Sequence, residues 1–342
     1  MTVLDVLVVG GGPVGLAAAV EARLAGLSVV VYEPRSAPVD KACGEGLMPG
    51  AVTALERLGV LPAGRPFAGI RYVDGQHSAD HRFRSGPGLG VRRTELHAAL
   101  AARVADLGIK VRPERVEVER QDAAGVVTTA GTRGRWLLAC DGLHSDVRRR
   151  LGLQRPTRHT PRYGLRRHFQ VMPWSDLVEV HWTPVGEVYV TPVADDVVGV
   201  AVLGGRGIDY AGVVARAAAI ADRLADVPTM SDLRGAGPLR QEATRRTLGR
   251  VLLVGDAAGY VDALTGEGIR LGLAQARAAV AAVAAGRPGD YERAWRGITR
   301  DYRVLTTSLV QAAGRPALRR RIVPLAARLP RIYGAIVDRL AT

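Results

Sequence analysis

The stretch that decides the fold is Val3-Leu4-Asp5-Val6-Leu7-Val8-Val9-Gly10-Gly11-Gly12-Pro13-Val14-Gly15. The apolar run before the glycines is typical of a buried strand in a parallel sheet. Residues Pro13–Ala25 are rich in alanine and leucine, and Gly26 follows them, which predicts a helix with a glycine at its carboxyl-terminal end. Ser28–Tyr32 is a second apolar run. This order of strand, glycine turn, helix and strand predicts a βαβ unit.

The glycines have the spacing G-x-G-x-x-G, directly after a strand and at the start of a helix. In this context Gly10 permits the turn, Gly12 lets backbone N–H groups approach a pyrophosphate, and Gly15 lets helix and strand pack closely. Glu33 follows the second strand, 18 residues after Gly15, where its carboxylate can accept hydrogen bonds from ribose hydroxyls. The unit therefore predicts a dinucleotide site. It does not by itself distinguish NAD from FAD.

Composition and charge exclude several other classes of protein. The chain has 342 residues, of which 47% are hydrophobic, so it can bury a core of one or two domains. Its net charge of +14 comes from arginines spread over the whole length, and we expect no nucleic-acid partner because a binding stripe is lacking. Two cysteines are too few for a disulfide framework or a metal site, which fits a cytoplasmic protein.

Other segments extend this organisation. Leu137–Cys140 and Val251–Val254 are short apolar runs, each leading into a pair of Asp and Gly, and Gly266–Ala285 is a long alanine-rich stretch. Around Gly69–Arg84 and residues 160–203, β-branched and aromatic residues alternate with polar ones, which predicts an antiparallel sheet with one covered face. We therefore expect an α/β protein in which a sheet-rich substrate domain interrupts a nucleotide-binding domain.

Two later strips favour a flavin. Asp256 follows a strand in Val254–Gly259, where an acid can hold a polyol hydroxyl. Residues Leu264–Ile269 then begin the long helix, and a glycine-rich helix start presents free N–H groups and a positive dipole end to an anion. Reduced flavin needs such a partner, because its pyrimidine side carries negative charge.

Together these strips resemble the flavoprotein hydroxylases of the p-hydroxybenzoate hydroxylase type and, within that superfamily, the geranylgeranyl reductase branch. The resemblance covers most of residues 1–290 and implies FAD as cofactor, with NAD(P)H as electron donor. It implies a Rossmann-like FAD-binding domain with a parallel sheet, an inserted antiparallel β-sheet substrate domain, and C-terminal helices. The expected ranges are 1–65, 86–158 and 240–290 for the FAD-binding domain, 66–85 and 159–239 for the substrate domain, and 291–342 for the helical segment.

The resemblance also assigns residues to the cofactor. The glycine turn and Glu33 match the adenosine-diphosphate site, Arg93 looks like the arginine on the ribityl-phosphate side, and Asp141 begins a strip associated with both FAD and the nicotinamide donor. Asp256 matches the acid on the ribityl chain. The full set of implied cofactor-binding residues is Gly10, Gly12, Pro13, Gly15, Glu33, Arg93, Asp141, Asp256, Gly266, Gly268 and Ile269.

Three residues are candidates for catalysis. Asp40–Leu47 looks like the Lys-x-Cys-Gly-x-Gly loop of the reductase branch, near the flavin. Within it, Cys43 is either a redox or proton-donating thiol or a small residue that packs a tight turn. Glu45 either contacts substrate or is solvated. Tyr189, on the sheet expected to cover the flavin, is either part of the pocket wall, which we favour, or an acid or base.

Three functions follow from this resemblance. We favour a monooxygenase that hydroxylates a phenolic or polyketide-like hydrophobic substrate, because hydroxylation is frequent in the superfamily. The alternative is reduction of isoprenoid C=C bonds by reduced FAD, as in the geranylgeranyl reductases. The third is a flavin-binding protein without catalytic activity. In each case we expect a monomer or homodimer.

The carboxyl-terminal end has a distinct pattern. Its arginines are interleaved with Leu, Ile, Val and Tyr333, which predicts an amphipathic surface segment. Such a segment either presents a solvated helix face or makes a peripheral contact with an anionic membrane or a hydrophobic substrate carrier. The arginines are Arg315, Arg319, Arg320, Arg321, Arg328, Arg331 and Arg339.

Overall fold

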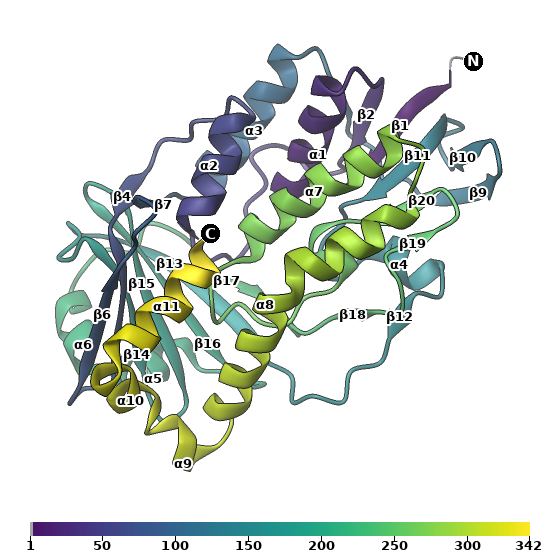
Figure 1. Ribbon diagram of the computed structural model, residues 1–342. Coiled ribbons are helices and arrows are strands. Elements are labelled where there is room, and N and C mark those ends of the chain that lie inside the picture. The colour runs from purple at the N-terminus through teal and green to yellow at the C-terminus, as the bar shows by residue number, and fades with distance from the viewer. Residues whose placement is uncertain (1–2) are drawn as a thin grey trace.

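The computed structural model describes residues 3–342, and its first layer is an eight-stranded sheet, most of whose strands are labelled in Figure 1. The strand order is β19-β20-β11-β1-β2-β8, with β10 paired to β11 and β9 to β10. The pairs among β20, β11, β1, β2 and β8 are all parallel. The strands are β1 (Leu4–Val9), β2 (Val29–Tyr32), β8 (Lys110–Arg112), β9 (Val118–Asp122), β10 (Gly125–Thr128), β11 (Arg133–Ala139), β19 (Thr247–Leu248) and β20 (Val251–Leu253).

A second, seven-stranded sheet has the order β17-β13-β16-β15-β14-β5-β6. Every neighbouring pair is antiparallel except β14 and β5, which run parallel. The strands are β5 (Gly69–Val73), β6 (Ser78–Arg82), β13 (Tyr163–Gln170), β14 (Leu177–Trp182), β15 (Gly186–Ala194), β16 (Val197–Gly204) and β17 (Arg234–Ala236). They fall within 66–85 and 159–239, while the expected domain limits themselves stay a prediction.

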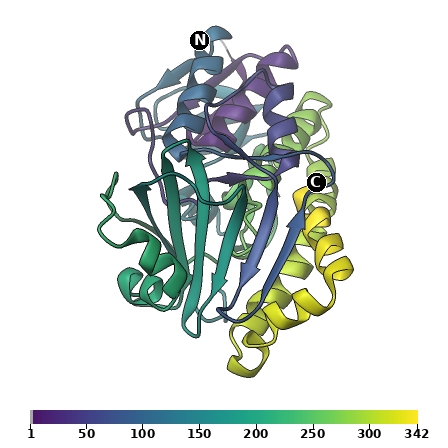
Figure 2. The same ribbon diagram turned by 90° about the vertical axis from the view of Figure 1, so that its left-hand side faces the viewer.

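The helices divide between the two sheets. Helix α1 packs on the eight-stranded sheet and contacts both α3 and α7, whereas α5 and α6 lie against the seven-stranded sheet (Figures 1 and 2). The helices are α1 (Pro13–Leu24), α2 (Pro49–Arg57), α3 (Arg93–Asp106), α4 (Asp146–Arg150), α5 (Tyr210–Ala215), α6 (Ala218–Leu224), the 3-10 helix η1 (Gly255–Ala258), α7 (Gly268–Ala284), α8 (Gly289–Ala313), α9 (Pro316–Arg319), α10 (Ile322–Arg328) and α11 (Pro330–Ala341).

Short strands complete the architecture. They form a three-stranded sheet of β3 (Gly46–Leu47), β7 (Gly88–Gly90) and β4 (Arg65–Phe67), and a pair of β12 (Gln154–Arg155) with β18 (Glu242–Ala243). The predicted α/β fold class, with its parallel sheet, antiparallel sheet and carboxyl-terminal helices, is confirmed.

The seven-stranded sheet differs from the prediction in one respect. Its alternating sequence predicts one covered face, yet every residue of β14 is buried. The polar residues Glu179 and His181 can be buried there because the carboxylate of Glu179 lies 3.1 Å from Nε2 of His181 and accepts a hydrogen bond from the Trp174 indole. The polar residues of the alternating pattern in β14 are therefore buried with hydrogen-bond partners and do not face water.

The carboxyl-terminal helices lie beside the edge of the seven-stranded sheet. Helices α10 and α11 contact β6, and α10 also contacts β5 (Figure 2). Among residues 3–342, no helix combines the length and the hydrophobicity needed to cross a bilayer.

Candidate functional site

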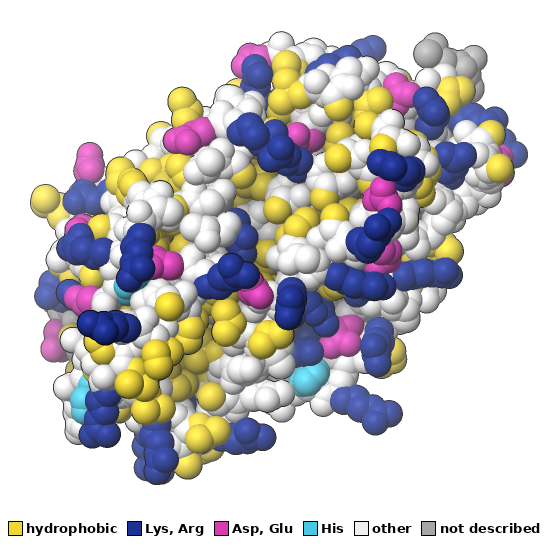
Figure 3. All heavy atoms as spheres, in the orientation of Figure 1, with side chains coloured by type: hydrophobic (Ala, Val, Ile, Leu, Met, Phe, Trp, Pro, Cys, Tyr) yellow, Lys and Arg dark blue, Asp and Glu magenta, His cyan; other side chains and the backbone are white. Residues whose placement is uncertain are grey.

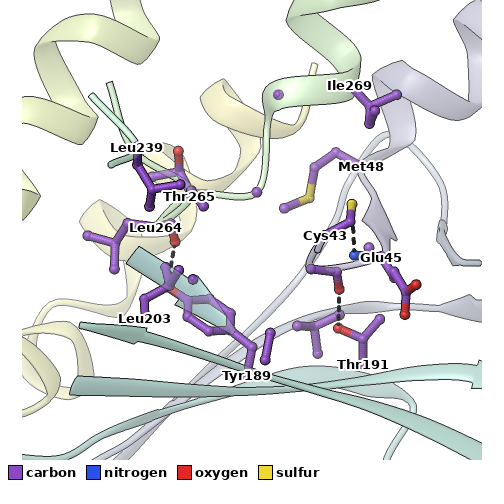
Figure 4. Close-up of a pocket in the computed structure, with 18 of the residues that line it drawn as sticks. Cys43, Glu45, Met48, Tyr189, Thr191, Leu203, Leu239, Leu264, Thr265 and Ile269 are labelled. Atoms are coloured by element: carbon purple, nitrogen blue, oxygen red, sulfur yellow. Dashed lines mark hydrogen bonds between the residues drawn. The ribbon is translucent and has the colours of Figure 1, made fainter. Parts of the chain in front are cut away.

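A cavity of about 630 Å³ connects the carboxyl ends of the parallel strands with the seven-stranded sheet and the carboxyl-terminal helices. The three candidate catalytic residues line it, as Figure 4 shows for Cys43, Glu45 and Tyr189. Most of the expected cofactor residues line it as well: Gly12, Pro13, Arg93, Asp141, Asp256, Gly266, Gly268 and Ile269. The remaining three, Gly10, Gly15 and Glu33, lie outside the cavity wall.

The glycine turn is built by close backbone packing. Gly10 has a φ of +101°, and a Cβ at this position would lie 2.5 Å from the carbonyl oxygen of Cys140. A Cβ on Gly15 would lie 1.8 Å from the carbonyl oxygen of Gly10, which no side chain tolerates. Gly12 has room instead, because a Cβ there would meet only a guanidinium nitrogen of Arg93 at 3.8 Å. Gly12 therefore leaves the start of α1 open to a ligand.

Glu33 supports the turn directly. Its Oε2 accepts a hydrogen bond of 2.9 Å from the Gly11 N–H, and its carboxylate pairs with Arg35 at 2.8 Å. Burial raises the pKa of Glu33, but the hydrogen bonds from Arg35 and Gly11 outweigh it and lower this pKa below its usual value. The carboxylate is thus held ionised beside the turn, while its role toward ribose hydroxyls stays a prediction.

Three buried polar atoms in the cavity wall have no hydrogen-bond partner among the described residues. They are Nε of Arg93, Nε of Arg166 and Oδ1 of Asp141. Lys41 is close to the same wall, with Nζ 3.6 Å from the place where a Cβ of Gly142 would stand. An unpartnered arginine nitrogen, a lysine and the open start of α1 suit phosphates, and an unpartnered carboxylate oxygen suits a hydroxyl. The donor set therefore fits FAD.

Arg148 was not predicted as a site residue, although it lies in the strip that begins at Asp141. It is 1% exposed, and its guanidinium donates hydrogen bonds to the carbonyl oxygens of Leu143 and Ala257, at 2.8 and 3.0 Å. It also donates to the side-chain oxygens of Gln154 and Gln241. Arg148 thereby ties the loop after β11 to η1, which carries Asp256.

The loop before β3 is held by Glu45, and the expectation that this side chain could be solvated is wrong. Glu45 is 3% exposed and has a φ of +61°. Its Oε1 accepts a hydrogen bond from the backbone N–H of Arg93 at the start of α3, and its Oε2 lies 2.6 Å from Nε2 of His168. A non-glycine residue in the left-handed region persists only where its surroundings fix it.

The network continues away from the cavity. Nδ1 of His168 lies 2.9 Å from Oγ of Ser231, which is half-buried, so hydrogen bonds connect the cavity wall with the molecular surface. Arg166, which is buried nearby and itself lines the cavity, pairs with Asp40 at 2.5 Å. Sequence reasoning missed His168 and Arg166, because neither lies in a motif and both reach the loop only through the folding of β13.

Cys43 and Tyr189 occupy fixed positions in the cavity wall (Figure 4). The backbone N–H of Glu45 donates to Sγ of Cys43 at 3.4 Å, as in a tight turn. The Tyr189 hydroxyl donates to the carbonyl oxygen of Leu264 at 2.8 Å, and burial holds the pKa of this phenol well above its usual value. This environment opposes acid–base chemistry by Tyr189 and suits a pocket wall.

The sequence predicts Arg319 on the surface, but it belongs to a second buried network of charged side chains. This residue belongs to the basic terminal segment, yet it is 9% exposed and its guanidinium lies 2.8 Å from the carboxylate of Glu187. Arg162 pairs with the same carboxylate at 2.6 Å and with Asp262 at 2.9 Å. Arg319 therefore anchors α9 to β15 instead of contributing to the surface.

Residues 3–290 match the family described as FAD binding domain. A menaquinone reductase of Mycolicibacterium smegmatis is 30% identical over 87% of this chain and 80% of the reductase. A rifampicin monooxygenase of Rhodococcus hoagii is 28% identical over 80% of this chain, which spans 62% of that protein, less than two thirds.

A solved structure of a geranylgeranyl bacteriochlorophyll reductase-like protein from Thermoplasma acidophilum has a TM-score of 0.78, at 21% identity over 96% of this chain and 92% of that one. This likeness concerns the fold. The family match covers most of the chain, and it agrees with the donor set of the cavity and with the superfamily that the motifs resemble. The chain therefore belongs to the FAD binding domain family and is an FAD-dependent oxidoreductase.

Proposed function

We propose that this protein is an NAD(P)H-dependent monooxygenase that hydroxylates a phenolic or polyketide-like hydrophobic substrate with a long apolar portion. The observation that supports this most is the shape of the cavity, which continues without interruption from the residues that fit FAD to apolar side chains of α8, α10 and α11. A substrate held there can place one end beside the flavin and extend its apolar body away from it.

The substrate end of the cavity offers dispersion contacts and little hydrogen bonding. Its walls are formed by apolar side chains from the seven-stranded sheet, from the loop after β17 and from the carboxyl-terminal helices, including Leu165, Val180, Leu203, Leu239, Leu309 and Ile322. Burying apolar surface contributes roughly 25 cal/mol per Å². The apolar portion of an extended substrate therefore binds mainly through the hydrophobic effect. The length of the cavity then determines where the reactive end of the substrate lies.

The bound FAD would supply the redox chemistry, taking hydride from the nicotinamide and reducing dioxygen. The chain would hold the isoalloxazine between the glycine start of α7 and the loop of Cys43, and Asp141 and Asp256 would hold hydroxyls of the cofactor. Glu45 lines the cavity and is joined to His168, so this pair can hold a proton released by a phenolic substrate. Ser231 connects the pair to the surface.

Isotope labelling tests the proposed reaction. The FAD-loaded protein is supplied with NAD(P)H, a long-chain alkylphenol and ¹⁸O₂, and the product is analysed by mass spectrometry. Monooxygenation incorporates one labelled oxygen atom into the ring. NAD(P)H consumption without oxygen in any product of a panel of alkylphenols and polyketide phenols contradicts the proposal.

A reductase acting on isoprenoid C=C bonds is the second candidate. It is favoured by the 30% identity to a menaquinone reductase and by the thiol of Cys43 in the cavity wall. Anaerobic incubation of the reduced protein with a polyprenyl substrate separates the two functions. Saturation of a double bond without oxygen, together with no labelled phenol under ¹⁸O₂, assigns the reductase.

A further inference from the structure

The outer faces of α9, α10 and α11 form an exposed apolar surface, called here the terminal surface. Its apolar members are Leu318, Leu325, Leu329, Ile332 and Ile336, which are between 39% and 56% exposed. In Figure 3 hydrophobic side chains gather over α10 and α11, with arginines around them. Large apolar side chains gathered in this way are unusual on a protein surface that faces only water.

This surface is also the mouth of the cavity. Leu325, Leu329, Ile332 and Ile336 belong to the cavity wall and are at the same time exposed. The apolar path that begins beside the residues fitting FAD therefore reaches the exterior between α10 and α11. A substrate that is almost insoluble in water would have to pass these side chains.

The charged residues around the cavity mouth are almost all arginines. Residues 315–342 contain seven arginines and a single acid, Asp338. Arg319 and Arg339 pair with Glu187 and Asp301. The remaining five arginines are exposed, and in the described part of the chain no carboxylate comes within ion-pair distance of them: Arg315, Arg320, Arg321, Arg328 and Arg331.

The scaffold under the terminal surface is fixed. His81 Nε2 on β6 lies 2.8 Å from Oδ1 of Asp338 on α11, and Tyr333 packs against Tyr72 on β5 with ring centroids 5.1 Å apart. Because Arg319 also holds α9 on β15, the inner faces of these helices are packed against the rest of the protein. Only their outer faces are available to a partner.

We propose that the terminal surface docks on an anionic lipid bilayer, with α10 and α11 lying in the interface and the cavity mouth facing the hydrocarbon. Apolar side chains flanked by arginines are the pattern by which a surface helix enters a headgroup layer, because the apolar groups are buried while the guanidinium groups contact lipid phosphates. A symmetric contact between two copies is disfavoured, since it would bring two such cationic surfaces together.

Docking itself is independent of the reaction that the enzyme performs. The added statement that a lipophilic substrate enters through this mouth rests on the proposed function. Vesicle binding is therefore measured without turnover, so that failure of docking and failure of the proposed reaction are distinguishable.

The test uses FAD-loaded protein and co-sedimentation with vesicles of mixed phosphatidylglycerol and phosphatidylcholine, or of phosphatidylcholine alone. We expect binding to the mixed vesicles at low salt, and weakening as salt is raised. The double variant R328E/R331E should lose at least about tenfold in affinity, since each basic residue contributes about 1 kcal/mol at an anionic surface. The matched control R120E/R158E changes two exposed arginines outside the terminal surface, for which no carboxylate pairing is found within residues 3–342, and should bind nearly as the parent protein does.

A second pair of variants tests the apolar contribution. Leu318→Glu alters an exposed leucine of α9 outside the cavity wall and should weaken vesicle binding, whereas Leu61→Glu alters a leucine that is 78% exposed elsewhere and should not. Equal losses in R328E/R331E and R120E/R158E would mean that net charge alone attracts the protein, which overturns the proposal. Absence of binding to the mixed vesicles overturns it as well, and so does a dimer, in light scattering, that Leu318→Glu dissociates.

Discussion

Oε2 of Glu45 lies 2.6 Å from Nε2 of His168, although 123 positions separate the two residues in the chain. The contact joins the loop before β3 to strand β13, and both side chains are buried. A second pair of the same chemistry, Glu179 with His181, lies on β14 at 3.1 Å, away from the cavity wall. The two pairs offer a controlled comparison of a glutamate at the cavity with one outside it.

Glu45→Gln should lower kcat by about 100-fold, the lower range for removal of a positioned acid–base group, because the amide cannot take up a proton. FAD affinity should change little, since Gln keeps the acceptor for the Arg93 N–H. Glu179→Gln is the control and should retain kcat. Equal losses of kcat in both variants would contradict a role of Glu45 in proton transfer.

Gly15→Ala should abolish FAD binding, or weaken it by more than about tenfold, because the added Cβ would stand 1.8 Å from the Gly10 carbonyl oxygen and force the turn apart. The measurement is fluorescence or absorbance titration of the deflavinated protein with FAD. Gly289→Ala, at a helical glycine with no atom within 4 Å of its Cβ position, is the matched control. FAD binding of normal affinity by Gly15→Ala would refute this account of the turn.

Arg148→Met should lower the free energy of unfolding by about 3–5 kcal/mol, the cost of breaking a buried network around a charge. The carbonyl oxygens of Leu143 and Ala257 would lose their donor and stay buried. Denaturant unfolding measures the effect. Arg149→Met is the control, because Arg149 is exposed and pairs only with Asp146 within the described chain. A loss below about 1 kcal/mol for Arg148→Met would show that the arginine is not needed to hold η1.

Glu267, at the start of α7, predicts a specific pH dependence of stability. Burial raises the pKa of this carboxyl from its usual value of 4.5 to about 7, although Arg270 opposes the shift from 2.5 Å. The folded state therefore binds a proton more tightly than the unfolded state does, and this contribution is present below pH 4.5 and lost as the pH rises through about 7.

Glu267→Gln removes that titration. Relative to the variant, the parent protein should lose up to about 3 kcal/mol of unfolding free energy between pH 4.5 and pH 8, at 1.36 kcal/mol per pKa unit. Unfolding of both proteins is followed across this range. A difference between them that is constant with pH would place the titration elsewhere.

The sequence alone predicts those parts of the fold that depend on residues close to one another in the chain. Gly10 and Gly15 are required by the turn between β1 and α1, and the apolar runs on either side predict a buried parallel sheet. The limits of α1 and α7 differ from the predicted ones by one or two residues, because helix ends depend on the next contacts as much as on the sequence.

Residues that depend on distant partners could not be predicted in this way. Arg319 looks like one more arginine of an amphipathic segment until β15 brings Glu187 to it. Glu45 looks equally suited to water until β13 supplies His168. In both cases the residue type is compatible with exposure and with burial, and the partner that decides lies far away in the chain.

The most direct test of the central claim, a single cavity that joins the flavin to a long apolar channel, is titration of the FAD-loaded protein with 4-alkylphenols of increasing chain length. Each added methylene that is buried should strengthen binding by up to about 0.8 kcal/mol. We predict that the long-chain phenols bind far more tightly than phenol and perturb the visible absorption of the flavin. Binding that does not depend on chain length, or that leaves the flavin spectrum unchanged, would contradict the account.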